Sequence, residues 1–509
     1  MLFNSLEFAF FLPIVFLIYW FVLQKNLKLQ NLFIVIVSYI FYGWWDYRFL
    51  FLIALTSFCS WYSGVLIGKF QSKAEQNMVE ATPTTKETTT KLNPSKIILV
   101  SNIVLNLAIL GFFKYYNFFV DSFIDLFSLF NVTLQASTLK IILPVGISFY
   151  TFQALSYSID VYRKKIEPTK DIVAFFAFVS FFPQLVAGPI ERATNLLPQF
   201  YKKRTFDYDT AVDGMRQILW GLFKKIVVAD NCAIYVNEVF ADYTNQSGST
   251  LLLGAIFFAF QIYGDFSGYS DIAIGTAKLF GIKLLRNFNV PYFSRDIAEF
   301  WRRWHISLNT WFVDYLYIPL GGSRPYVSPD SKHPELTKKA KVIRNTFAIF
   351  LTSGLWHGAN WTFVAWGAYH ALLFIPLILL GKNKRFTDTV ATDRILPNIR
   401  EVFQMLLTFL LVVIGWVFFR AETITDAFAY FGGIFDSSLL SVPFIPSGTI
   451  RTFVAVGILL FVEWCFRLKN HPFEISKFNT VLRYVIYYIL ILIILEFGAN
   501  SQSFIYFQF

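Results

Sequence analysis

The sequence predicts an all-α protein that crosses a membrane several times. Of its 509 residues, 56% are hydrophobic and 20% are aromatic. Charged residues make up 15% of the chain, well below the roughly 25% that is usual in soluble domains. The apolar residues form long runs, and a helix needs about 17–25 residues to span a bilayer. We therefore expect a single integral-membrane domain over residues 1–509.

The first apolar run, residues 8–23, predicts a retained first helix, because it lacks the basic start and the cleavage site of a signal peptide. Basic residues lie in the short loops between apolar runs, such as Lys25, Lys28 and residues 163–165. The positive-inside rule makes these loops cytoplasmic and places the N-terminus outside. This distribution accounts for the net charge of +11 without a nucleic-acid partner. Residues 71–95, rich in Thr, Lys and Glu, read as a flexible cytoplasmic loop.

The middle of the chain is less regular. Residues 219–230 carry Lys224 and Lys225 inside an apolar run, which favours a position at the membrane interface over a span. Residues 251–282 are long enough to span, yet they contain five glycines and several polar residues, among them Asp265. Such stretches are tolerated where they face protein or a water-filled cavity. We expect this segment to line an internal chamber, with Asp265 as a candidate binding residue.

Residues 295–311 predict one amphipathic helix. One face is apolar at helical spacing, and the other carries charged residues; the apolar set is Phe300, Trp304, Leu308 and Trp311, and the charged set is Arg295, Glu299 and Arg302. An interfacial helix held by aromatic side chains explains most of this pattern. The alternative is a binding site in which Arg302 and Arg303 hold a phosphate of a cofactor or carrier. His305 lies within the same segment.

His357 stands in an apolar stretch, with Trp356 and Asn360 beside it as candidate binding residues. Hydrocarbon does not solvate an imidazole, so a histidine there indicates a functional site, the alternative being a core histidine bonded to a neighbouring helix. Both flanks are basic, and twelve residues separate Asn345 from His357, about 18 Å of helix. This predicts a re-entrant hairpin with residues 356–360 near its tip. The alternative topology is two full spans. Burial keeps the imidazole neutral, which suits a general base.

Three further spans follow at residues 402–419, 452–466 and 481–495, leaving residues 500–509 as an external tail. The sequence holds no nucleophile elbow, phosphate loop or dinucleotide motif. Neither the histidines nor Cys59, Cys232 and Cys465 have metal-ligand spacing, so no metal is predicted. A proton-coupled transporter is the alternative class, but the inverted repeats expected of one are not found.

Four motifs closely resemble the membrane-bound O-acyltransferases, and the bacterial alginate O-acetyltransferase branch is nearest. They are residues 183–189 (PQLVAGP), 295–305, 317–322 (YIPLGG) and 354–360 (GLWHGAN), and the likeness runs from residues 3–8 to residues 504–509. The resemblance implies a ring of tilted helices around a thin centre crossed by a tunnel, with catalytic core segments in residues 287–380. The family's near-invariant histidine matches His357, and a second functional histidine matches His305.

The reaction implied by this resemblance moves an acyl group, usually acetyl, from a cytoplasmic thioester to a hydroxyl outside. His357 would deprotonate the hydroxyl, and His305 would bind or orient a substrate or assist proton transfer. No bound cofactor is implied, since acetyl-CoA or an acyl-carrier thioester is a substrate. The implied acceptor is an exported polysaccharide such as alginate, or a partner protein that completes the transfer.

Acetyl or D-alanyl transfer to peptidoglycan or teichoic acid is the alternative to that acceptor. A periplasmic or extracellular acetyltransferase is the expected partner, and the bacterial inner membrane is the expected location. Tyr506 is a possible acyl relay, against the alternative of an aromatic anchor at the membrane interface.

Overall fold

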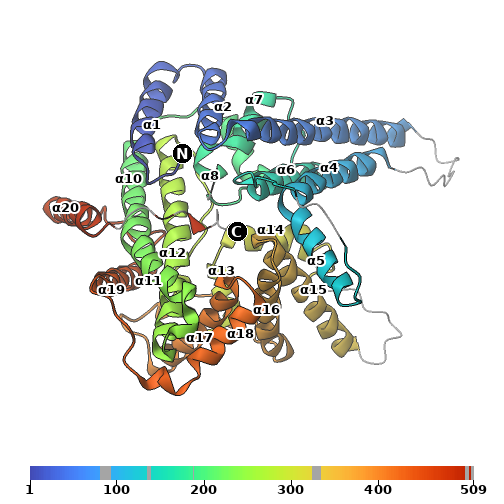
Figure 1. Ribbon diagram of the computed structural model, residues 1–509. Helices are drawn as coiled ribbons and strands as arrows, with labels where there is room; N and C mark the ends of the chain where they lie inside the picture. The colour runs from blue at the N-terminus through green and yellow to red at the C-terminus, as the bar shows by residue number, and fades with distance from the viewer. Residues whose placement is uncertain are drawn as a thin grey trace. The chain divides into compact units, whose positions relative to one another are not determined.

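The computed structural model describes residues 1–80, 93–134, 139–186, 188–323, 334–498, 502 and 504–505. Every regular element in these ranges is a helix (Figure 1). Six of the described helical segments are long and apolar enough to cross a membrane; they are Tyr47–Gln76, Pro94–Ser128, Gly248–Leu279, Trp361–Leu379, Ile399–Arg420 and Thr480–Phe497. The prediction of an all-α polytopic membrane protein is therefore confirmed.

The helices form two compact units, and the first comprises Met1–Ala211 with Ala277–Leu284. Its principal helices are α1 (Leu6–Leu17), α2 (Leu27–Gly43), α3 (Leu50–Glu80), α4 (Pro94–Leu110), α5 (Tyr116–Ser128), α6 (Ile147–Tyr162) and α7 (Ile172–Ser180). The shorter elements are η1 (Ile18–Val22), η2 (Tyr47–Phe49), η3 (Gly111–Tyr115), α8 (Phe182–Leu185), α9 (Ala193–Leu196) and η4 (Leu197–Phe200). Together α1 and η1 cover the predicted first helix.

The predicted loop at residues 71–95 is partly wrong, because α3 continues to Glu80. The side chain of Gln71 donates a hydrogen bond to the carbonyl of Tyr162 at 2.9 Å, and Glu75 pairs with Lys164. These contacts with the end of α6 extend the helix into polar sequence. Residues 81–92 lie outside the described residues.

The second unit comprises Val212–Thr276 and Leu285–Phe509. Its first half contains α10 (Tyr208–Leu222), η5 (Phe223–Ala229), α11 (Asp230–Ala241), η6 (Tyr243–Asn245), α12 (Gly248–Leu279), η7 (Pro291–Phe293), α13 (Ile297–Arg303), α14 (Ile306–Phe312) and η8 (Val313–Tyr317). Its second half contains α15 (Pro334–His357), α16 (Trp361–Leu379), α17 (Ile399–Arg420), α18 (Ile424–Ile434), η9 (Ser437–Leu440), α19 (Thr449–Cys465) and α20 (Thr480–Phe497). The last three predicted spans correspond to α17, α19 and α20.

The interfacial position expected for residues 219–230 is wrong. Lys224 and Lys225 are buried, with exposed fractions of 3% and 1%. Lys224 pairs with Asp271 of α12, and Lys225 lies 2.9 Å from Asp265 of the same helix. The lysines point inward because carboxylates on α12 meet them, and a buried charge needs such a partner.

The predicted span at residues 251–282 is confirmed as α12, which runs unbroken through its glycines. These glycines let α12 approach its neighbour closely. A Cβ atom at Gly268 would stand 2.8 Å from the carbonyl oxygen of Gly221. Small residues at such crossings bring membrane helices into backbone contact. The close packing places the polar side chains of α12 beside those of η5.

Candidate active site

His357 is the last residue of α15, at the tip of a helical hairpin. Three residues connect α15 to α16, and the two helices lie side by side (Figure 1). A Cβ atom at Gly354 would stand 2.2 Å from the carbonyl oxygen of Phe363, and one at Gly367 would stand 2.3 Å from that of Phe350. The two glycines thus bring the helix backbones into contact. A helical hairpin with its tip at residues 356–360 is therefore present, and its re-entrant course in the membrane stays a prediction.

The two arms of this hairpin are longer than expected. They contain 24 and 19 residues, about 36 and 28 Å at 1.5 Å per residue. Each is close to the roughly 30 Å of a hydrocarbon core. By length and composition α16 can cross a membrane, whereas α15 is not among the six candidate spans, because its first half carries five charged residues (Glu335, Lys338, Lys339, Lys341 and Arg344).

Aromatic rings enclose the His357 imidazole, which is 5% exposed. The ring centroids of Trp356, Trp366 and Phe419 lie 4.9, 5.1 and 5.2 Å from that of His357. We call these three rings with His357 and His305 the aromatic enclosure. The side chains around His357 are bulky and leave little room for water.

His305 reaches the same enclosure from a break between two helices. The single helix predicted for residues 295–311 is wrong, because α13 ends at Arg303 and α14 begins at Ile306. His305 itself has a φ of 45°, in the left-handed region that non-glycine residues seldom adopt. Segment 287–289 stabilises the break, since Ile306 N–H donates to the Asn287 carbonyl and Asn289 N–H donates to the Arg303 carbonyl, both at 2.9 Å.

The structure brings the two histidines together. The ring centroids of His305 and His357 are 6.4 Å apart, and Trp356 lies 5.8 Å from His305. Phe266 of α12 packs edge-on against His305 at 4.6 Å. Burial lowers the pKa of His305 to about 3, so its ring is neutral at physiological pH. The two imidazoles therefore face one enclosure, where both could meet a bound hydroxyl.

The arginines proposed to bind phosphate are engaged with protein groups. Arg303 lies 2.9 Å from Glu299 and donates to the Asp388 carbonyl at 2.8 Å. Arg302 donates to the Asn383 carbonyl at 2.9 Å. Arg295, on the same charged face, pairs with Glu299 at 3.0 Å. These bonds tether loop 383–388 to α13.

Asn360 also bonds to protein. Its side-chain oxygen accepts from Thr362 N–H at 3.0 Å and so caps α16, and its amide nitrogen donates to the Glu422 carbonyl at 2.8 Å. Asn360 therefore connects the hairpin tip to the loop after α17. Trp356, the other neighbour of His357, contributes its ring to the aromatic enclosure.

Asp265 contacts the C-terminal segment of the chain. One carboxylate oxygen accepts from Ile505 N–H at 2.7 Å, and the other lies 2.9 Å from Lys225. Lys225 also donates to the Gln502 carbonyl at 3.2 Å. Phe504 is buried, with its ring 4.3 Å from that of Tyr269. Tyr506 lies outside the described residues.

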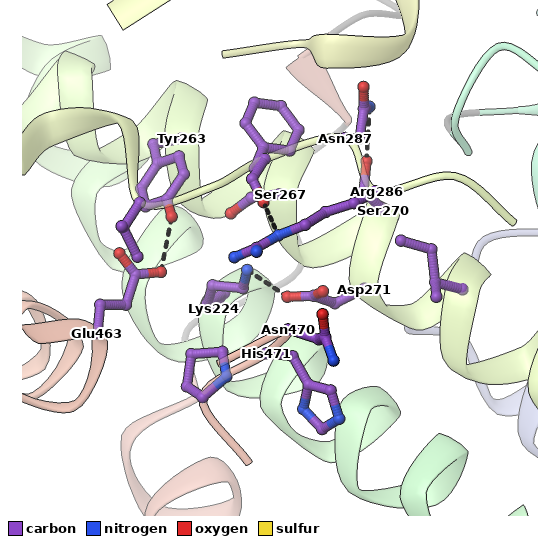
Figure 2. A pocket seen from close by; sticks show the side chains of 14 residues that line it. Lys224, Tyr263, Ser267, Ser270, Asp271, Arg286, Asn287, Glu463, Asn470 and His471 are labelled. Atoms are coloured by element: carbon purple, nitrogen blue, oxygen red, sulfur yellow. Dashed lines mark hydrogen bonds and ion pairs between the residues drawn. The ribbon is translucent and has the colours of Figure 1, made fainter. Parts of the chain in front are cut away.

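A small polar pocket lies beside α12, and Asn287, which also contacts His305, lines it (Figure 2). Lys224 and Arg286 contribute positive charge to its wall, and Asp271 and Glu463 contribute carboxyl groups. Glu463 accepts from the Tyr263 hydroxyl at 2.7 Å. The polar chamber expected along α12 is therefore present, lined by Ser267, Ser270 and Asp271 and without Asp265.

Sequence reasoning missed several residues of this pocket and of the connection to His305, chiefly Asn287, Arg286 and Glu463. All three gave a usable signal. Arg286 and Asn287 stand just ahead of the charged segment that contains His305, and Glu463 is an acidic residue inside an apolar run. A charged side chain within such a run indicates a polar partner.

The model of the membrane-bound O-acyltransferase family (MBOAT) matches residues 39–419 of the sequence. The chain belongs to this family. His305 and His357 both lie in the matched range. As a member, the protein is an O-acyltransferase and a multi-pass membrane protein, and the resemblance found from the motifs is confirmed.

Individual relatives of this O-acyltransferase carry different names. The "Probable alginate O-acetylase AlgI" of Pseudomonas aeruginosa is 39% identical over 86% of this chain and 75% of its own length. The peptidoglycan O-acetyltransferase of Helicobacter pylori is 31% identical over 100% of this chain and 98% of its own length. The teichoic acid D-alanyltransferase of Bacillus subtilis is 27% identical over 55% of this chain and 69% of its own length.

Proposed function

We propose that this O-acyltransferase moves an acetyl group from a cytoplasmic thioester to a hydroxyl of an exported polysaccharide such as alginate. The proposal rests on the convergence of His305 and His357 in the aromatic enclosure, at 6.4 Å between ring centroids. The similarity to alginate O-acetylases over 86% of the chain supports the choice of acceptor. The protein would act in the inner membrane of a bacterium.

In the proposed reaction, His357 accepts the proton of the acceptor hydroxyl as its oxygen attacks the thioester carbonyl. The carbon–sulfur bond then breaks, and His357 returns the proton to the leaving thiolate. The products are an ester and a free thiol, so His357 ends as it began. The surrounding rings exclude water, which would otherwise hydrolyse the thioester.

Acetyl-CoA or an acyl-carrier protein is the proposed donor, and both present the acyl group on a pantetheine arm that carries phosphate. The pocket beside α12 offers cationic side chains for such a group. Arg286 donates through Nε to the Phe288 carbonyl at 2.7 Å, which leaves the outer edge of its guanidinium to the pocket. A planar guanidinium suits a phosphate oxygen pair.

Tyr506 is proposed as a relay that receives the acyl group before it passes to the polymer or to a periplasmic acetyltransferase partner. The contact of its neighbour Ile505 with Asp265 at 2.7 Å supports this role. The competing role is an aromatic anchor at the membrane interface. Intact-mass analysis after incubation with donor tests the relay, and no Tyr506 adduct under any turnover condition would refute it.

Acetyl transfer to peptidoglycan is the second candidate, because the peptidoglycan O-acetyltransferase of Helicobacter pylori is matched over 98% of its length. Ester-linked acetate should therefore be measured on both exopolysaccharide and peptidoglycan in cells with and without the gene. Loss of acetate from one polymer alone identifies the acceptor.

His357→Ala tests the proposed base. We expect membrane insertion to survive and acetylation of the polymer to disappear. His333→Ala is the matched control, since His333 stands in polar sequence apart from the motifs, and it should retain wild-type acetylation. Unchanged acetate in the His357→Ala strain would overturn the assignment.

A further inference from the structure

Asn287 forms a set of hydrogen bonds that ends on His305. Its side chain is fully buried. The Oδ1 atom lies 3.0 Å from Nδ1 of His305, 2.9 Å from the hydroxyl of Ser307 and 3.4 Å from the backbone nitrogen of Ser307. The Nδ2 atom donates to the hydroxyl of Ser270 at 3.0 Å. Asn287 thus connects α12 to the helix break.

The partners of Asn287 determine which way its amide faces. The backbone N–H of Ser307 can only donate, so the atom in front of it must be the oxygen. A flipped amide would set its NH₂ group against that N–H. Ser270 faces the other end, and its hydroxyl accepts from Nδ2.

This orientation fixes the tautomer of His305. Because Oδ1 of Asn287 is an acceptor, the ring nitrogen 3.0 Å away must donate, and Nδ1 carries the hydrogen. In a neutral imidazole the other nitrogen, Nε2, then has only a lone pair. Nε2 has no hydrogen-bond partner among the residues that the structure describes, although His305 is 2% exposed.

Two unfavourable features therefore meet at His305. An unpartnered buried acceptor destabilises the folded protein, and so does a left-handed backbone on a non-glycine residue. Such costs concentrate at functional sites. The His305 ring lies in the aromatic enclosure with His357, where an acceptor hydroxyl next to the reacting one would supply the missing donor.

We infer that Asn287 is a positioning residue that keeps His305 in the Nδ1–H tautomer, so that Nε2 accepts a hydrogen bond from a second hydroxyl of the acceptor, beside the one that His357 deprotonates. The inference deepens the proposed function and rests on it. A bare Nε2 cannot donate to the oxyanion that forms on the thioester carbonyl. His305 therefore orients the acceptor, and it does not stabilise that oxyanion.

The tautomer is measurable on the unaltered protein. The chain has five histidines, so histidine-selective ¹⁵N labelling gives a small set of NMR signals, and His305→Gln identifies the one of interest. We expect protonated Nδ1 and bare Nε2. A protonated Nε2 with bare Nδ1 would overturn the inference. This readout needs no turnover, so it stands even where acetyl transfer itself is not observed.

Asn287→Asp tests the consequence for activity. A carboxylate still accepts from Ser307 and from Nδ1 of His305, and it also favours a second proton on the ring. We expect the acid limb of the pH–rate profile to move up by at least one pH unit, the size of shift that a close carboxylate produces. The control is Asn398→Asp, which makes the same change of charge at the residue that caps α17. It should leave the pH–rate profile unchanged.

The charged groups around His305 are the same in the wild-type protein and in Asn287→Asp. A difference between their pH–rate profiles therefore comes from position 287. The titratable and charged groups on the elements around His305 are His357 of α15, Asp265 and Asp271 of α12 with their partners Lys225 and Lys224, Arg286, and Arg303 of α13. A wild-type profile for Asn287→Asp would mean that the residue only fills space. If that variant fails to insert, the tautomer measurement still decides the inference.

Discussion

The close contact between α15 and α16 predicts that a methyl group added at Gly354 displaces His357. In Gly354→Ala, the new methyl carbon would stand 2.2 Å from the carbonyl oxygen of Phe363. Carbon and carbonyl oxygen ordinarily meet at about 3.3 Å or more, so the helices must separate by about 1 Å. The obstacle is backbone and cannot rotate away. His357 lies less than one helical turn beyond Gly354 and moves with α15.

A displacement of about 1 Å at a reacting group costs on the order of 100-fold in rate, or about 2.7 kcal/mol of activation free energy. Overpacking should also cost about 1–3 kcal/mol of stability. We therefore expect Gly354→Ala to insert normally and to lose about 100-fold in kcat. The assay is thiol release with ester formation in membranes supplied with acetyl-CoA and acceptor polymer.

Gly457→Ala is the matched control, because nothing lies within 4 Å of a Cβ atom built at Gly457 of α19. It should keep wild-type kcat. Wild-type kcat in Gly354→Ala would refute the argument that the glycine contact sets the position of His357. Equal losses in both variants would assign the effect to membrane folding in general.

Two further variants probe the charges that support the site. Lys225→Met removes the partner of Asp230 and Asp265 and should lower the free energy of unfolding by about 3–5 kcal/mol. The measure is thermal unfolding in detergent, and an unchanged midpoint would contradict it. Arg295→Lys loses the forked contact with Glu299 and should cost about 1.5–3 kcal/mol; a control, Arg48→Lys on an exposed pair, should unfold at the wild-type temperature.

The membrane helices and His357 could be predicted because each is a local property of the sequence. An apolar run such as residues 402–419 has one stable arrangement in hydrocarbon, which is a helix. A histidine in such a run stands out for the same reason. The glycine contact of Gly354 with Phe363 was not predictable, because it depends on which turns of α15 and α16 face each other.

The break at His305 had no local signal. Phe300, Trp304, Leu308 and Trp311 keep helical spacing straight through it, and a continuous helix fits them equally well. The break exists because Asn287, eighteen residues earlier, binds both the ring of His305 and the N–H of Ile306. A pattern of polarity does not show that the side chain and the carbonyl of one distant residue bond to the ends of the two helices.

The positions predicted for the charged residues were wrong because the partner of each contact lies far away in the sequence. Lys225 in an apolar run looks interfacial until Asp265, forty residues later, is beside it. Arg302 looks free for phosphate because its partners are backbone carbonyls at residues 383 and 386. Every residue has a carbonyl, so this kind of partner leaves no trace in composition or spacing.

The separation of charge from the aromatic enclosure has a chemical consequence. Lys225 is paired with Asp265, and Arg303 with Glu299, so these cations are compensated. An unpaired cation beside the enclosure would favour thiolate and alkoxide alike and would draw in water. With charges compensated, the proton of the hydroxyl in the proposed reaction would move to the imidazole only when the thioester carbonyl is in place to receive the oxygen. On that proposal, the pairing would couple proton transfer to acyl transfer and would protect the thioester from hydrolysis.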